Sequence, residues 1–97
     1  MLDKRKFYIN GEWVSPSKNS DFNVINPATE EPYVTISLGN EDDTNKAVVA
    51  AKNAFTIWKN SSVEERITLL EKLLEIYKRR FNEMTQAIST ELGAPLD

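Results

Sequence analysis

The sequence predicts a local α+β fold, in which short strands come first and helices follow. An Asn10-Gly11 dipeptide between two apolar tripeptides is typical of a β-hairpin. From Tyr33 to Leu38 apolar and polar residues alternate, which indicates a further strand. Between Ser62 and Gly93 the apolar residues recur at steps of three and four, the period of an amphipathic helix. Strands followed by helices favour α+β organisation.

The strands are expected within residues 7–38. Residues 1–6 are polar, and we expect them to be frayed. Phe7–Ile9 and Glu12–Val14 should form a hairpin with a type I′ turn, because Asn and Gly both tolerate the positive φ that this turn requires. Residues 15–20 form a polar loop.

A second strand is expected at 22–25, with the sequence Phe-Asn-Val-Ile. Asn26-Pro27 ends it, since proline cannot donate to a strand ladder and Asn-Pro favours a turn. The next strand, 33–38, places Val34, Ile36 and Leu38 on one face.

A first helix is expected over 40–59. Asn40 is a good N-cap, and the three acidic residues after it suit the positive end of the helix dipole. One face of this helix carries Ala47, Ala51, Phe55 and Trp58, and its small alanines favour close approach to a neighbour.

The stretch 62–92 is expected to be one long helix or two helices. Ser62 and Glu65 form a capping box at its start, and Gly93 followed by Pro95 ends it. Neither Pro nor Gly occurs in 78–84 to force a break between two helices, so the stretch can continue as one helix when chains pack side by side.

The apolar stripe of this stretch is its most informative feature. It is wider than a two-position coiled-coil seam and has no clear pattern of flanking charges, which favours the buried face of a larger fold over a coiled coil. Its central residues are Val63, Ile67, Leu70, Leu74, Tyr77, Phe81, Met84, Ile88 and Leu92, and its flank is Leu69, Leu73 and Ile76.

Composition bounds the possible functions. The chain has 97 residues and a net charge of −3, which allows one domain at most and argues against a general nucleic-acid binder. The basic runs 4–6 and 78–80 are interpreted as solvated. No apolar run approaches the roughly 20 residues of a membrane span, and the N-terminus does not have the pattern of a secretory signal. A cytoplasmic location is therefore expected.

No side chain points to an active site. The sequence contains no Cys and no His, which excludes a thiolate nucleophile, a Ser-His-Asp relay and a His-ligated metal. Neither glycine-rich nucleotide-binding pattern occurs. We therefore assign no catalytic, cofactor-binding or metal-ligating side chain.

Three groups of residues resemble site residues but have structural interpretations. The Glu30-Glu31 pair is expected in an exposed turn, and Glu64-Glu65 is explained by helix capping. Trp13 and Trp58 could stack on a ligand, but buried packing is the favoured interpretation.

The arrangement of motifs resembles the N-terminal segment of the NAD(P)-dependent aldehyde dehydrogenase superfamily over nearly all of the chain. Two departures are Glu30, where the family often has glycine, and Ala94, where lysine is common. The matching motifs are Phe7 to Val14, Phe22 to Thr29, Ala47-Val48 and Ala50-Ala51 through Ala54-Phe55 to Trp58, Glu65-Arg66, and Glu91 to Leu96.

The resemblance implies an α/β parent enzyme that oxidises an aldehyde to a carboxylic acid with NAD or NADP. In the family a cysteine, a glutamate, an oxyanion asparagine and the cofactor contacts all lie downstream of this segment. Residues 1–97 would then be the N-terminal part of the coenzyme-binding domain, inactive alone and binding no cofactor themselves. The implied partners are the remainder of the fold and further copies in a homo-oligomer, with no nucleic acid or membrane.

The resemblance also implies a possible monovalent cation site made of backbone carbonyls. The matching positions are Val24, Ile25 and Glu91. Such a site would explain a carboxylate near a helix C-terminus, where the dipole disfavours it. A different class of function also remains open, namely a stand-alone helical interaction module that self-associates through the 63–92 stripe.

Overall fold

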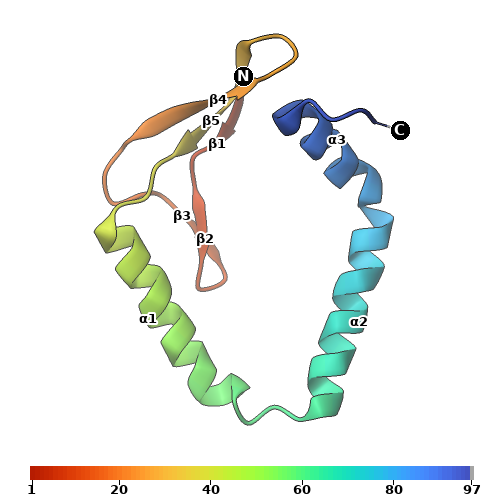
Figure 1. Ribbon diagram of the computed structural model, residues 1–97. Helices are drawn as coiled ribbons and strands as arrows, with labels where there is room; N and C mark the ends of the chain where they lie inside the picture. Colours follow the sequence, from red (N-terminus) through yellow and green to blue (C-terminus); the bar gives the residue numbers. More distant parts are fainter. Residues whose placement is uncertain (97) are drawn as a thin grey trace.

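The computed structural model describes residues 1–96 and contains five short strands followed by three helices (Figure 1). The elements are β1 (Leu2–Lys4), β2 (Phe7–Ile9), β3 (Glu12–Val14), β4 (Asp21–Asn26), β5 (Glu31–Ser37), α1 (Glu41–Trp58), α2 (Val63–Arg79) and α3 (Phe81–Leu92). The expected local α+β organisation is confirmed.

The strands form a three-stranded sheet of order β1-β5-β4 and a separate β2-β3 hairpin. Here the expectation that residues 1–6 are frayed is wrong: β1 pairs in parallel with β5, and Leu2 lies opposite Val34. The Ser37 hydroxyl donates to the Arg5 carbonyl at 2.7 Å and holds the segment after β1 in place. Polar composition did not prevent pairing, because β5 offers this strand a free edge.

The hairpin has the predicted turn. Asn10 has a φ of 56° and Gly11 a φ of 78°, so both central residues have the positive φ of a type I′ turn. Tyr8 lies opposite Trp13 in the register, and their rings are 5.1 Å apart between centroids.

The turn between β4 and β5 contains Glu30, at the position where the resembled family often has glycine. Glu30 adopts a φ of 60°, a left-handed conformation that glycine takes without strain. Its N–H donates to the Asn26 carbonyl at 2.8 Å, and the Asn26 side chain accepts from the Ala28 N–H at 2.9 Å. Both strands differ in extent from the prediction, and Leu38 lies just outside β5, half exposed.

The predicted helix starts are confirmed. Asn40 and Asp43 form a capping box at α1, and Ser62 and Glu65 form one at α2. Gly93 ends α3 with a φ of 74°, and a Cβ added there would lie 3.2 Å from Cγ of Pro27. The C-terminus of α3 therefore lies against the turn that follows β4.

The stretch 62–92 forms two helices, one of the two alternatives that the sequence left open. The helices separate at Arg80, where φ is −103° and ψ is 17°. The Arg80 guanidinium pairs with Glu83 in the first turn of α3 at 2.8 Å. Arg80 therefore closes α2 and begins α3, although neither Pro nor Gly is present to force the break.

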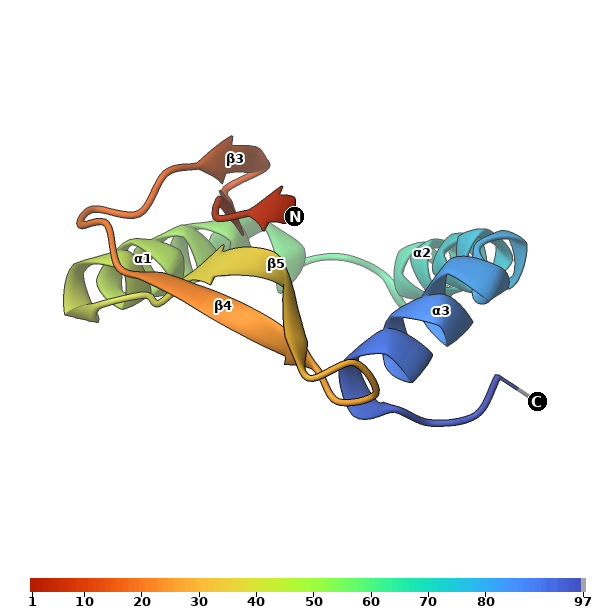
Figure 2. The same cartoon turned by 90° about the horizontal axis from the view of Figure 1, so that it is seen from above.

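The shape is open and flat. Figure 1 shows α1 and α2 as two arms that diverge from the 59–62 connection, with α3 returning to the sheet. The radius of gyration is 17.2 Å, against about 13 Å for a compact chain of this length. The extents are 48 × 38 × 15 Å, and the view from above in Figure 2 shows how thin the structure is.

Very little of the described chain is buried. Val34 is the one buried apolar residue among residues 1–96, and the buried polar residues there are Ser37 and Asp43. The accessible surface is 8225 Å², whereas a folded monomer of this mass exposes about 5,700 Å². Stable domains pack at least two layers around a core, and most of this chain has only one.

Candidate functional site

The first candidate surface is the exposed apolar stripe along α2 and α3. Leu70 is 63% exposed, Leu74 52% and Leu92 75%. The remaining exposed members of the stripe are Val63, Ile67, Leu69, Leu73, Tyr77, Phe81, Met84 and Ile88. The whole chain exposes about 2,500 Å² more than a compact monomer, which exceeds the roughly 800 Å² that each partner buries in a standard interface. This face therefore matches the interior of a larger fold.

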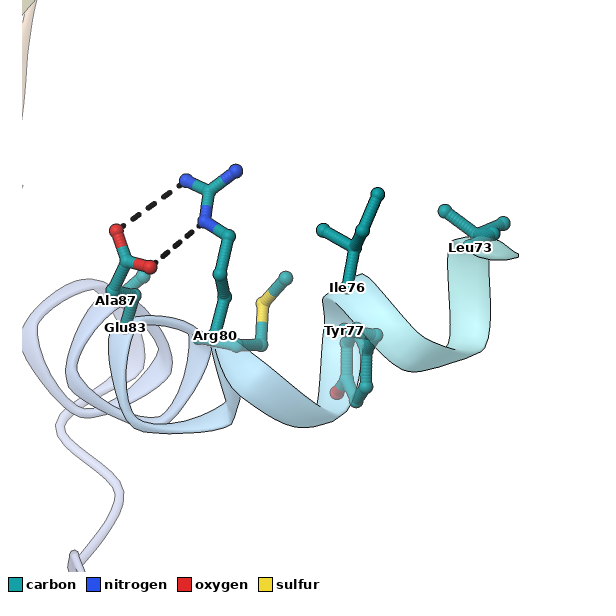
Figure 3. A pocket seen from close by; sticks show the side chains of 7 residues that line it. Leu73, Ile76, Tyr77, Arg80, Glu83 and Ala87 are labelled. Atoms are coloured by element: carbon teal, nitrogen blue, oxygen red, sulfur yellow. Dashed lines mark hydrogen bonds and ion pairs between the residues drawn. The ribbon is translucent and has the colours of Figure 1, made fainter. Parts of the chain in front are cut away.

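The stripe contains a hollow at the break between α2 and α3 (Figure 3). Its volume is about 350 Å³, and Leu73, Ile76, Tyr77, Met84 and Ala87 line it together with the Arg80–Glu83 pair. In Figure 3 the guanidinium lies beside the carboxylate, with hydrogen bonds of 2.8 and 3.3 Å. These bonds lower the pKa of Glu83 and raise that of Arg80. The hollow is thus apolar with one charged border, which suits apolar side chains from another segment.

The aromatic residues of the sequence lie on exposed surfaces as well. Trp13 is 68% exposed and Trp58 45%, so the interpretation of both as buried packing residues is wrong for this chain. Trp13 contacts Tyr8 on the outer face of the hairpin, and Trp58 ends α1 beside exposed Phe55 and Ile57. Their exposure follows from the missing second layer.

One buried carboxylate fixes the hairpin segment to α1. The Asp43 side chain accepts from the Ser17 N–H at 2.9 Å and from the Asn40 N–H at 3.1 Å. The Ser17 N–H is the main cause that holds the pKa of Asp43 below its usual 3.8, and burial opposes it. Asp43 thus joins the loop after β3 to the first turn of α1, and this role is structural.

The paired carboxylates do not form a site. Glu30 and Glu31 lie in the exposed turn before and at the start of β5, as predicted. The Glu65 side chain accepts from the Ser62 N–H at 3.1 Å, which leaves it a capping role. Among residues 1–96 no three His, Cys, Asp or Glu side chains gather as a metal would require.

The first turns of the three helices carry carboxylates. Helix N-termini bind phosphate through free N–H groups, often beside glycine. At α1 the first turn carries three acidic residues and its cap is occupied by Asp43, and at α2 the cap is occupied by Glu65. At α3 the first turn carries Glu83. Negative charge at each of these helix starts would repel a pyrophosphate.

The elements that hold the candidate cation carbonyls do come together. The register of β4 shifts between Val24 and Ile25, and α3, which carries Glu91, packs against β4. An irregular strand can leave carbonyls free to bind an ion. The carbonyls of Val24, Ile25 and Glu91 as cation ligands stay a prediction.

The environment of Tyr33, near Glu91 of α3, could not be predicted from the sequence. Its hydroxyl is shielded from solvent and has no hydrogen bond of ordinary geometry within the described part of the chain. Burial, and next the nearby Glu91, raise the pKa of Tyr33. The alternation around Tyr33 predicted a strand but gave no signal of Glu91, which lies 58 positions later in the sequence.

Comparisons with known proteins identify the family of this chain. The family model for the aldehyde dehydrogenase family matches residues 13–97, and the chain belongs to that family. It is 52% identical over 96 residues to a putative aldehyde dehydrogenase of Staphylococcus epidermidis, covering 99% of this chain and 20% of that protein. A Staphylococcus aureus putative aldehyde dehydrogenase is 49% identical with the same coverage. The resemblance seen in the sequence is confirmed.

Solved structures that resemble this chain are aldehyde dehydrogenases as well. The chain is 54% identical to an aldehyde dehydrogenase from Bartonella henselae, with a TM-score of 0.99 over 100% of this chain and 20% of that one. A Pseudomonas syringae aldehyde dehydrogenase C mutant, in complex with NAD+ and octanal, gives 39% identity and a TM-score of 0.93, over 95% of this chain and 19% of that one.

The chain therefore spans about a fifth of the length of the relatives that it matches. In those relatives the matched segment lies within a much longer protein, so the alternative of a stand-alone interaction module is not supported. Within residues 1–96, no helix has both the length and the apolar character needed to cross a membrane.

Proposed function

We propose that this chain is the N-terminal part of the coenzyme-binding domain of an enzyme that oxidises aldehydes to carboxylic acids with NAD or NADP. The observation that carries the proposal is the match of the entire chain, at 54% identity and a TM-score of 0.99, to one fifth of the Bartonella henselae aldehyde dehydrogenase. The Pseudomonas syringae relative, which holds NAD+ and octanal, supports the reaction class.

In this proposal the segment supports the enzyme and does not carry out its chemistry. The sequence has no Cys or His to attack or relay a proton, and its helix N-termini carry carboxylates where a phosphate would bind. The nucleophile and the cofactor contacts then belong to the remaining four fifths of the enzyme. The stripe on α2 and α3 packs against that remainder, and α1 offers it Phe55 and Trp58.

We further propose a cytoplasmic homo-oligomer for the whole enzyme. The support is the family resemblance noted in the sequence and the family match. The isolated 97-residue chain should reduce no NAD+ or NADP+ with any aldehyde, because no thiol is present to attack the carbonyl. Turnover by purified chain would contradict this assignment.

A chimera tests the proposal. The first fifth of the Bartonella henselae enzyme is replaced by residues 1–97, and NADH or NADPH formation is measured with a panel of aldehydes. We expect a soluble chimera with aldehyde-dependent reduction of the cofactor, since the matched segments superpose over the whole chain. A soluble, folded chimera that binds cofactor but oxidises no aldehyde would refute the proposed role.

A further inference from the structure

The turn of the β2-β3 hairpin presents an exposed Asn-Gly pair. Both Asn10 and Gly11 are exposed, and a Cβ added at Gly11 would meet nothing within 4 Å. Figure 1 shows this turn at the free end of the hairpin, pointing away from the three-stranded sheet. Asn10 is the only asparagine in the sequence that glycine follows.

Hydrogen bonding does not protect the pair. In the part of the chain that the structure describes, the Gly11 N–H donates to no turn or loop carbonyl, and the Asn10 amide has no side-chain hydrogen bond. Asn60 shows the opposite situation: the N–H of the residue after it, Ser61, donates to the Trp58 carbonyl at 3.0 Å. The Asn60 amide itself donates to the Thr56 carbonyl at 3.5 Å.

The hairpin can also open locally. Each of its strands has three residues, and an isolated two-stranded hairpin is marginally stable in water. Short segments with few buried contacts open at little cost in free energy. The turn therefore samples the extended conformations in which the Gly11 nitrogen can reach the Asn10 side chain.

From these observations we infer that Asn10 is a site of spontaneous deamidation through a cyclic imide with Gly11. The Gly11 amide nitrogen loses its proton to base and attacks Cγ of Asn10, forming a nitrogen–carbon bond. The bond from Cγ to Nδ2 breaks, and the nitrogen leaves as ammonia after it gains a proton. Water then opens the imide at either carbonyl and yields aspartate or isoaspartate, so no oxidant or cofactor is needed.

The isoaspartate product breaks the turn. In isoaspartate the main chain runs through the side-chain carbon, so one extra backbone atom enters a connection of two residues. A two-residue turn fixes the register of its strands, and the pairing of Tyr8 with Trp13 depends on that register. The 5.1 Å contact between their rings is lost, and the chain gains one negative charge.

The test is ageing of the 97-residue chain in mildly alkaline buffer at physiological temperature. Peptide mapping by mass spectrometry measures conversion at each asparagine, and Trp13 fluorescence, recorded in a Trp58→Phe background because the sequence has two tryptophans, follows the hairpin. We expect Asn10 to convert several-fold faster than Asn19 and Asn60, each of which precedes serine. Conversion at Asn10 no faster than at these two would overturn the inference.

The matched control is Asn10→Gly. Glycine keeps the positive φ that the turn requires but has no amide to cyclise. Its Trp13 signal should therefore stay constant under the conditions that change the signal of the unaltered chain. Equal loss of signal in both chains, or isoaspartate at position 10 with an unchanged Trp13 signal, would contradict the proposed effect on the hairpin.

Discussion

Leu74→Asp should reduce the self-association of the isolated chain, and it should lower the stability of the chimera with the Bartonella henselae enzyme. Leu74 lies in the middle of the stripe and is 52% exposed. In the isolated chain the exposed stripe should drive association, because an apolar patch of this extent is unusual for a monomer. An aspartate there should reduce association and leave the helix content nearly unchanged.

In the chimera the same change should destabilise the protein. Completing the burial of a half-exposed leucine contributes about 1 kcal/mol, half of the roughly 2 kcal/mol for a fully buried one. An unpaired buried carboxylate costs about 3 kcal/mol or more besides. The expected loss of about 4 kcal/mol is a large part of the 5–15 kcal/mol that stabilises a typical protein.

Light scattering on the isolated chain and urea unfolding of the chimera measure the two effects. The matched control is Thr68→Asp, which adds the same charge at an exposed position on the polar side of α2. It should change stability by no more than about 0.5 kcal/mol. A chimera that tolerates Leu74→Asp as well as Thr68→Asp, or an isolated chain that is monomeric with and without the change, would refute the reasoning.

Three further predictions concern the chimera and can be measured by thermal or urea unfolding. Glu30→Gly should raise the free energy of unfolding by about 1 kcal/mol, since it removes the strain of a left-handed residue; no gain would count against the turn. Gly11→Val should lower it by about 1–3 kcal/mol, because a β-branched residue resists positive φ, and an unchanged transition would argue against the hairpin. The Ser17 N–H holds the folded pKa of Asp43 below 3.8, so this contribution to stability is present above about pH 4 and is lost as pH falls through the lowered pKa. Asp43→Asn should weaken that acid dependence, and an identical pH profile would exclude the role.

Features that depend on neighbouring residues could be predicted from the sequence. The Asn10-Gly11 turn, the Asn40 and Ser62 caps and the Gly93 helix end all have the predicted conformation. In each case the residue type satisfies a backbone requirement within four positions, so no tertiary contact is needed to specify it.

Features that depend on distant residues could not be predicted. β1 forms because β5, about 30 residues later, offers it an edge, and nothing in 1–6 indicates that partner. The break at Arg80 has no Pro or Gly to mark it. The exposure of Trp13 follows from the layer that this chain lacks, whereas its apolar character alone favoured burial. The positions of the candidate cation site come only from the family resemblance.

The central claim is that the α2–α3 stripe is an interior face of a longer fold, and hydrogen exchange tests it most directly. Amide exchange is followed by mass spectrometry across residues 63–92 in the chimera and in the isolated chain, the latter kept dilute enough to be monomeric by light scattering. If the claim is right, these amides exchange readily in the isolated chain, where the stripe is exposed, and are strongly protected in the chimera, since stable units open only at free energies near the global value. Equal protection in the two proteins would show that the remainder of the enzyme does not cover this face, and would contradict the account.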